Sequence, residues 1–196
     1  MDEINGEIGG SEPGVPESWR FSIDVAAGWE RAFFAVPTPS TRKVALRSAM
    51  VMSPDAGGIF DVMLRLVRWG FGGAAGSGDQ YVSWIHDVDF IRAIEFLIDR
   101  EAISGAVNIS SPFPIPNREF MCCLRRAWCT SYFGLPTPKW ALEIGAVLMR
   151  TETELVLKSR RVVPRRLLDA GFEFHFPKWR GAATDLVARW RQLNSD

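Results

Sequence analysis

The sequence has no excess of either charge, no long apolar run, and few cysteines, histidines or tyrosines. Lys and Arg together number 23, as do Asp and Glu, so the net charge at neutral pH is zero. This balance disfavours electrostatic binding of nucleic acid as the main task. No apolar run approaches the roughly 20 residues that cross a bilayer, and the chain does not open on the basic and apolar segments of a secretory signal. We therefore expect a cytoplasmic protein with no nucleic-acid or membrane partner. Its 47% content of hydrophobic residues indicates a globular fold.

The cysteines do not form a metal-binding pattern. Cys122, Cys123 and Cys129 are odd in number and fall in one expected helix. They lack the paired spacing of metal ligands and have no histidine nearby. We expect free thiols in a reducing compartment and no metal site.

Familiar catalytic and phosphate-binding motifs are also missing. The sequence contains no Ser-His-Asp signature, nucleophile elbow or zinc-binding helix motif. The glycine-rich segment from Gly70 to Gly78 departs from the dinucleotide pattern, since position 75 is Ala. It also follows an expected helix and leads into a strand, whereas a phosphate-binding turn follows a strand and opens a helix. We favour a flexible loop near a substrate over a phosphate-binding turn.

The most informative feature present is an expected strand at 43–53 that is apolar on both faces. Such strands lie inside parallel sheets that helices cover on both sides. The residues before it contain no comparable strand, so the chain resembles the back half of an α/β protein whose front half is missing.

Expected strands and helices alternate along the rest of the chain, which indicates an α/β fold. We divide the chain into a loop or disordered lead-in at 1–18, a main part at 19–136 and a small helical part at 137–196. The further expected strands are 105–111 and a short one at 160–163. The expected helices are 21–34, 58–69, 87–98, 117–129, 140–149, 164–170 and 179–190.

Two histidines and two aspartates deserve separate interpretation. His86 lies between an expected strand end and a helix start, where sites of open α/β sheets gather. It could hydrogen-bond a substrate or satisfy a backbone group, and we favour the structural role slightly. Asp87 is expected to cap the following helix, and it cannot pair with Asp89 on one helix face. His175 is expected to be structural.

Several blocks of the sequence together resemble the extended short-chain dehydrogenase/reductases, and more narrowly the branch of NAD-dependent epimerase/dehydratase-like proteins. Arg161 to Phe172 resembles the small C-terminal domain of unknown function that closes this branch. The other blocks that carry the resemblance are Leu46–Pro54, Gly76–Gln80, Ser83–Asp89, Asn108–Ser111 and Asn117–Phe120.

The resemblance implies a Rossmann-like domain that binds NAD or NADP, a smaller substrate domain and a Tyr-x-x-x-Lys catalytic centre. This sequence has no glycine fingerprint, and its two tyrosines, Tyr81 and Tyr132, are followed four residues later by Ile85 and Pro136. We therefore expect a partial Rossmann-like fold that lacks the N-terminal nucleotide-binding half and ends in a helical tail. No catalytic residue is assigned, and the cofactor is not expected to bind to this chain alone.

The resemblance also assigns residues to a site. Ser53 and Pro54 would lie at the carboxyl end of a sheet strand, beside the nicotinamide of the cofactor. Turn geometry is the simpler explanation of Pro54 and the glycines, and a core or lid role is the commoner one for Trp84. The residues that would line the substrate side are Gly76, Gly78, Gln80, Ser83, Trp84 and His86.

Two functions from different classes remain open at this point. The first is a truncated NAD(P)-dependent epimerase or oxidoreductase-like protein, a substrate-side half that is inactive alone. Its partner would be a separate N-terminal half, and the complemented protein would act on a small molecule. The second is a non-catalytic interaction module that docks on a separate chain through an exposed strand edge and apolar surface.

Overall fold

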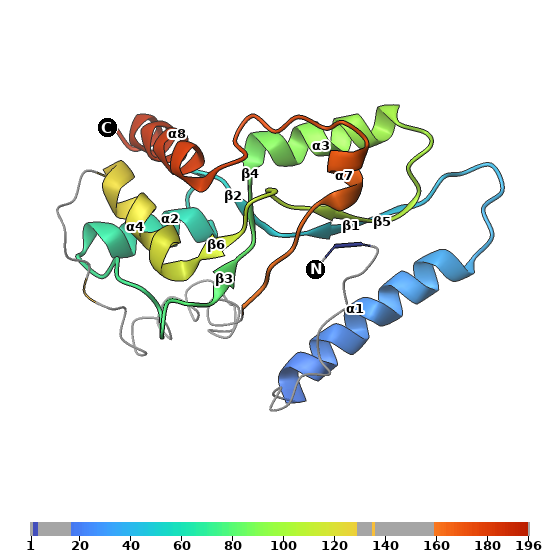
Figure 1. Ribbon diagram of the computed structural model, residues 1–196, viewed down its shortest axis with the longest axis horizontal. Coiled ribbons are helices and arrows are strands. Elements are labelled where there is room, and N and C mark those ends of the chain that lie inside the picture. The colour runs from blue at the N-terminus through green and yellow to red at the C-terminus, as the bar shows by residue number, and fades with distance from the viewer. Residues whose placement is uncertain (1, 4–16, 129–134, 136–158, 196) are drawn as a thin grey trace.

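Two short pairs of parallel strands carry the fold, and helices pack around them (Figure 1). The computed structural model describes residues 2–3, 17–128, 135 and 159–195. The elements in chain order are α1 (Glu17–Ala35), β1 (Val44–Ser48), β2 (Met50–Met52), α2 (Ile59–Arg68), β3 (Tyr81–Val82), β4 (Trp84–His86), α3 (Asp87–Asp99), β5 (Gly105–Ile109), β6 (Ile115–Pro116), α4 (Asn117–Trp128), α7 (Arg165–Asp169) and α8 (Trp179–Leu193).

The strand expected at 43–53 is divided at Ala49, where the backbone changes its hydrogen-bonding partner. β1 pairs in parallel with β5 from Val44 to Ser48, and β2 pairs in parallel with β4 from Met50 to Met52. The Ala49 N–H donates to the carbonyl of Ile109, whereas the Met50 N–H points to the carbonyl of Ser83. A continuous apolar run does not reveal such a change, because both halves have the same pattern. β3 and β6 form a separate antiparallel pair.

β4 contributes to two hydrophobic clusters, because successive side chains of a strand point to opposite faces. Trp84 packs with α2, α4 and α8, while Ile85 packs with α3, β5 and α7. Burial of each such large side chain stabilises the fold by roughly 1.5–3 kcal/mol. The first cluster includes the fully buried Phe60, Leu64, Leu124, Ala182 and Leu186, and the second includes Ala93, Val107, Ile109 and Leu167.

The expected helices are confirmed where the structure describes them, with small shifts at their ends. The expected helix at 179–190 continues to Leu193, and the one at 21–34 begins earlier, at Glu17. The strand expected at 160–163 is wrong: this segment borders β3 through single hydrogen bonds, with the Arg160 N–H donating to the Tyr81 carbonyl. The expected helix at 140–149 and Cys129 lie outside the described residues.

α1 projects from the rest of the protein (Figure 1) and leaves much of its apolar surface exposed. Phe21 and Trp29 are 71% and 73% exposed. The helix is tethered by the Arg47 guanidinium, which donates two hydrogen bonds of 2.7 Å to the carboxylate of Glu30. Lys43 adds a 2.6 Å hydrogen bond to the carbonyl of Phe33. No helix in the described ranges is both long and apolar enough to cross a membrane.

Candidate functional site

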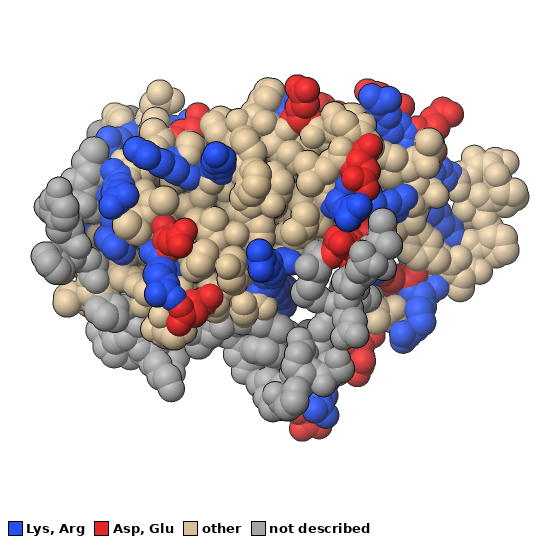
Figure 2. Space-filling model, in the orientation of Figure 1, with Lys and Arg blue, Asp and Glu red and all other residues tan. Residues whose placement is uncertain are grey.

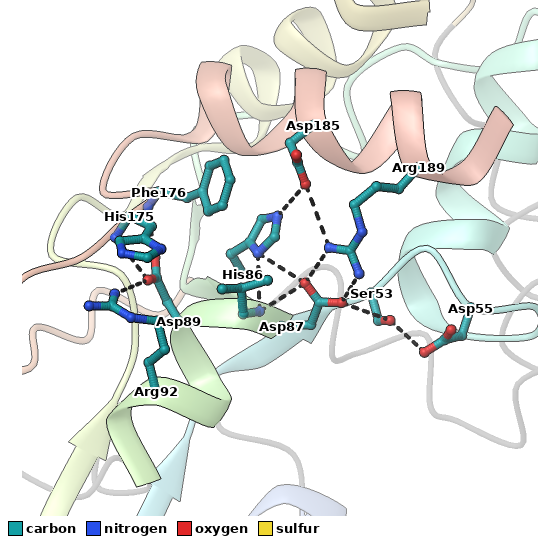
Figure 3. Close-up of polar contacts among 11 residues, drawn as sticks. Ser53, Asp55, His86, Asp87, Asp89, Arg92, His175, Phe176, Asp185 and Arg189 are labelled. Atoms are coloured by element: carbon teal, nitrogen blue, oxygen red, sulfur yellow. Dashed lines mark hydrogen bonds and ion pairs between the residues drawn. The ribbon is translucent and has the colours of Figure 1, made fainter. Parts of the chain in front are cut away.

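The candidate site lies at the carboxyl ends of β2 and β4. These strands are parallel, and Met52 is in register with His86, so the residues that follow them meet at one edge. Ser53 and Asp87 are those residues, and the Ser53 hydroxyl lies 3.3 Å from a carboxylate oxygen of Asp87. Figure 3 shows them facing Asp185 and Arg189 of α8. We call this group, with His86 and Asp55, the Ser53 network.

His86 occupies the centre of the network and has no exposed surface. Its Nε2 is 3.0 Å from Asp185, its Nδ1 is 2.9 Å from Asp87, and its ring stacks on Phe176 with centroids 3.9 Å apart. A neutral ring with its proton on Nε2 donates to Asp185 and accepts from the Val88 N–H, while an imidazolium donates to both carboxylates. In either state both nitrogens are engaged within the protein.

Asp87, the first residue of α3, is joined to α8 by a two-pronged ion pair. The Arg189 guanidinium donates hydrogen bonds of 2.8 and 2.7 Å to its two carboxylate oxygens. Burial acts to raise the pKa of Asp87, but hydrogen bonds and charge from His86 and Arg189 outweigh it and hold this pKa far below its ordinary value. Asp87 is therefore a carboxylate at neutral pH. Asp87 was expected to cap α3, but α3 begins at Asp87 and His86 is its N-cap. The side chains of both residues accept a hydrogen bond from the Val88 N–H.

Ser53 lies between two carboxylates but has one proton to donate. Its hydroxyl is 2.5 Å from Asp55 and 3.3 Å from Asp87, so the shorter contact to Asp55 takes the hydrogen bond. Asp55 is exposed, whereas Ser53 is half-buried. The network thus fixes a serine hydroxyl at the strand ends.

Asp89 holds the neighbouring chain segment against the start of α3. Its buried carboxylate accepts 2.8 Å hydrogen bonds from the backbone N–H groups of His175 and Phe176, and Arg92 pairs with it at 3.0 Å (Figure 3). These contacts place Phe176 over the His86 ring. Asp87 and Asp89 have different partners, as their spacing on α3 predicts.

The glycine-rich loop forms a second group of predicted site residues at the start of α4. Gln80 donates to the Ala75 carbonyl at 2.8 Å, and the Asn117 side chain accepts from the Ala75 N–H at 2.8 Å. Gly78 has a positive φ of 74°, and a Cβ there would lie 2.8 Å from the Cβ of Ala74. Gly76 also has a positive φ, of 59°, and is exposed. The loop follows α2 and precedes β3, the order that disfavours a phosphate-binding turn.

The remaining predicted residues anchor other parts of the protein. The Ser83 hydroxyl donates to the Arg160 carbonyl at 2.7 Å and accepts from the Val162 N–H at 2.9 Å. Trp84 is buried against Trp179, with ring centroids 5.0 Å apart, and its Nε1 has no hydrogen-bond partner in the described part of the chain. Pro54 is buried beside Ser53. The predicted set therefore divides into the Ser53 network with the adjacent Pro54, the glycine loop, and the two structural anchors Ser83 and Trp84.

The sequence interpretation missed Asp185, Arg189 and Asn117. Asp185 and Arg189 are separated from their partners by 99 and 102 residues. No local motif links such distant positions. Asn117 lay within a recognised block, and its place at the start of an expected helix was the available signal.

Comparison with solved structures gives the class of fold. The chain is similar to the human epimerase family protein SDR39U1 (isoform 2), solved with NADPH, with a TM-score of 0.79 and 28% identity over 96% of this chain and 59% of that one. The UDP-N-acetylglucosamine 4-epimerase of Bacillus cereus shares the fold, with a TM-score of 0.59 and 12% identity over 93% of this chain and 58% of that one. The fold is therefore the Rossmann-like α/β fold of epimerases.

Particular relatives agree with this class. The chain is 35% identical over 157 residues to the epimerase family protein Mb2239 of Mycobacterium bovis, covering 79% of this chain and 50% of that protein. It is 33% identical over 168 residues to SA0724 of Staphylococcus aureus, covering 85% and 54%. A family model described as a domain of unknown function, DUF1731, matches residues 137–186.

These matches confirm the expected relationship to epimerase family proteins and the presence of a domain of unknown function that includes the block from Arg161 to Phe172. The chain spans about half the length of the curated relatives it matches.

Proposed function

We propose that this chain is the substrate-side part of an NAD(P)-dependent epimerase or oxidoreductase-like protein and is inactive alone. The relationship to epimerase family proteins, and a similar structure solved with NADPH, support the nicotinamide cofactor. In the proposal Ser53 and Pro54 contact the nicotinamide end of the cofactor. Gly76, Gly78 and Gln80 border the substrate. NAD or NADP would supply hydride chemistry when bound, and this chain's residues would position the reacting groups.

The state of His86 is the observation that carries the proposal. An acid–base group must reach the proton it transfers within hydrogen-bond distance of the substrate. His86 is fully buried, and both of its ring nitrogens are engaged within the protein. The network therefore orders Ser53 without offering an exposed histidine as an acid–base group, so in the proposal a complementary part supplies that group.

The exposed apolar surface of α1 and β1 supports a complementary chain. Phe21, Trp29 and Leu46 are 71%, 73% and 41% exposed, and apolar patches of this kind mark interaction surfaces. The same surface favours the second function, a non-catalytic module that docks on a partner. The two functions differ in whether partner binding creates a cofactor site.

Calorimetry separates these functions. NADH and NADPH are titrated into the purified chain alone, and into the chain mixed with the separately expressed region of Staphylococcus aureus SA0724 that lies outside the match. We expect no micromolar binding by the chain alone and micromolar binding by the mixture. Micromolar binding by the chain alone would contradict the proposal. A stable complex that binds neither cofactor would favour the interaction module.

A variant pair tests the docking surface in the same experiment. Trp29→Glu places a charge on the exposed face of α1 and should abolish complex formation. Ile91→Glu is the matched control, because Ile91 is 57% exposed on α3. Equal effects of the two changes would exclude α1 as the docking surface.

A further inference from the structure

A cleft separate from the Ser53 network lies where α2, α4 and α8 end. Its volume is about 580 Å³, within the range of small-molecule sites. No residue of the Ser53 network lines it. The lining residues are Arg65, Arg68, Trp128, Trp190, Arg191, Asn194 and Ser195.

Three guanidinium groups from two helices line this cleft, and among the described residues Asp61 is the carboxylate that pairs with one of them. That carboxylate is already shared: it accepts from Arg65 at 3.0 Å, from the Trp190 Nε1 at 2.8 Å and from the Gly57 N–H at 2.9 Å. Burial acts to raise the pKa of Asp61, but these hydrogen bonds lower it below its ordinary value. Asp61 therefore neutralises one guanidinium and leaves a positive excess among the described side chains that line the cleft.

Tryptophan rings hold two of the guanidiniums in place. Arg68 lies 4.9 Å from the ring centre of Trp190 and 5.5 Å from that of Trp128, and Arg191 lies 4.4 Å from that of Trp128. Stacking on a ring restricts a guanidinium while leaving its N–H edges available for an anion. Figure 2 shows Lys and Arg side chains at the end of the molecule that carries α4 and α8, with Asp and Glu side chains among them.

Capping of helix ends explains only part of this arrangement. Arg191 donates a 3.0 Å hydrogen bond to the Trp128 carbonyl at the end of α4, which is an ordinary C-terminal role. Arg65 pairs with Asp61. Arg68 has ring contacts but, within the described residues, neither a carboxylate nor a carbonyl partner. Its N–H groups are thus available to a ligand.

We propose that this cleft binds a small molecule bearing phosphate groups, with Arg68 as the principal contact and Arg65 and Arg191 beside it. Guanidinium groups match phosphate oxygens with paired, charge-assisted hydrogen bonds. The site requires neither the nicotinamide cofactor nor a partner chain, so it goes beyond the proposed function. It would give the protein a second ligand, bound away from the Ser53 network.

Calorimetric titration of the full chain with inorganic pyrophosphate and with inorganic phosphate tests the proposal. We expect saturable pyrophosphate binding, at least tenfold weakened in Arg68→Ala and partly retained in Arg68→Lys. Arg100→Ala is the matched control, because Arg100 also stacks on a ring, that of Phe96 at 5.0 Å, but elsewhere. It should bind as the unchanged protein does.

A thermal melt of each variant keeps the result interpretable, because a ligand of the native state raises the melting temperature. Pyrophosphate should stabilise the unchanged protein and Arg100→Ala but not Arg68→Ala. Absence of saturable binding, or equal binding by Arg68→Ala, would overturn the proposal. A lower melting temperature of Arg68→Ala with unchanged binding would show that Arg68 only stabilises the helix ends. If the chain alone binds NADPH and Arg68→Ala abolishes that binding, the NADPH is bound in this cleft. Such a result is therefore distinguishable from binding at the cofactor site of the proposed function.

Discussion

Asp87 holds together three groups that the sequence places far apart. Its carboxylate contacts the His86 ring and lies across the strand pair from the Ser53 hydroxyl. It also accepts two hydrogen bonds from the Arg189 guanidinium of α8. A carboxylate that accepts several charge-assisted hydrogen bonds contributes more than an isolated surface pair. The pKa of Asp87 is lowered because hydrogen bonds and charge from His86 and Arg189 outweigh the effect of its burial.

Replacement of Asp87 by Asn should destabilise the protein by about 1.5–3 kcal/mol. It weakens hydrogen bonds to charged groups and leaves Arg189, among the described residues, with only its longer 3.5 Å contact to Asp185. Urea unfolding measures the change in the free energy of unfolding. Asp169→Asn is the control: its pair with Arg165 is exposed, with side-chain exposures of 52% for Arg165 and 59% for Asp169, and such pairs contribute about 0–1 kcal/mol. Equal losses for the two variants would contradict the role assigned to Asp87.

Stability should also depend on pH through Asp87. Its pKa is lowered in the folded protein, so its contribution is complete above the ordinary carboxyl pKa of about 4. The contribution is lost as the pH falls through the lowered folded-state value. Urea unfolding between pH 2 and 6 should show a steeper loss of stability on acidification in the unchanged protein than in Asp87→Asn. Parallel pH curves would refute this linkage.

Helices and strands were predictable from the sequence where the local pattern of apolar residues alone determines them. The apolar stripe of α2 and the run before Ser53 predicted a helix and a strand, and both are present. The division at Ala49 was not predictable, because it depends on which strand lies beside each half. The link from α8 to His86 was hidden for the same reason: Asp185 and Arg189 acquire their role only when distant elements pack.

The glycine loop gives a prediction at this scale. Gly78→Ala should destabilise more than Gly70→Ala, although both glycines have positive φ, of 74° and 87°. An added Cβ at Gly78 meets Ala74 at 2.8 Å, whereas one at Gly70 meets nothing within 4 Å. Gly70→Ala therefore measures the conformational penalty alone, about 1–2 kcal/mol. Equal losses in urea unfolding would show that the loop yields around Gly78.

The whole molecule presents an apolar face on α1 that the rest of the described chain leaves uncovered. A domain is stable by only about 5–15 kcal/mol, so unburied large side chains remove a substantial part of the margin. The epimerase relationship was predictable from several blocks that occur together. The exposure of α1 in three dimensions was not, since an amphipathic pattern does not show what covers the helix.

The purified chain should therefore bind a hydrophobic dye and self-associate. Dye fluorescence and size-exclusion chromatography with light scattering measure both effects, and the change Phe21→Glu with Trp29→Glu should reduce them. A monodisperse monomer with a sharp two-state melt and no dye binding would count against an exposed interaction surface.

β4 has a consequence for cooperativity. Trp84 belongs to one hydrophobic cluster and Ile85 to the other, so we expect an opening that displaces β4 to disrupt both clusters together. Native-state hydrogen exchange should report this coupling as one subglobal unit. The slowest amides of α3 and of α8 should exchange with the same free energy and the same denaturant dependence, although the two helices pack on opposite faces of a strand only three residues long.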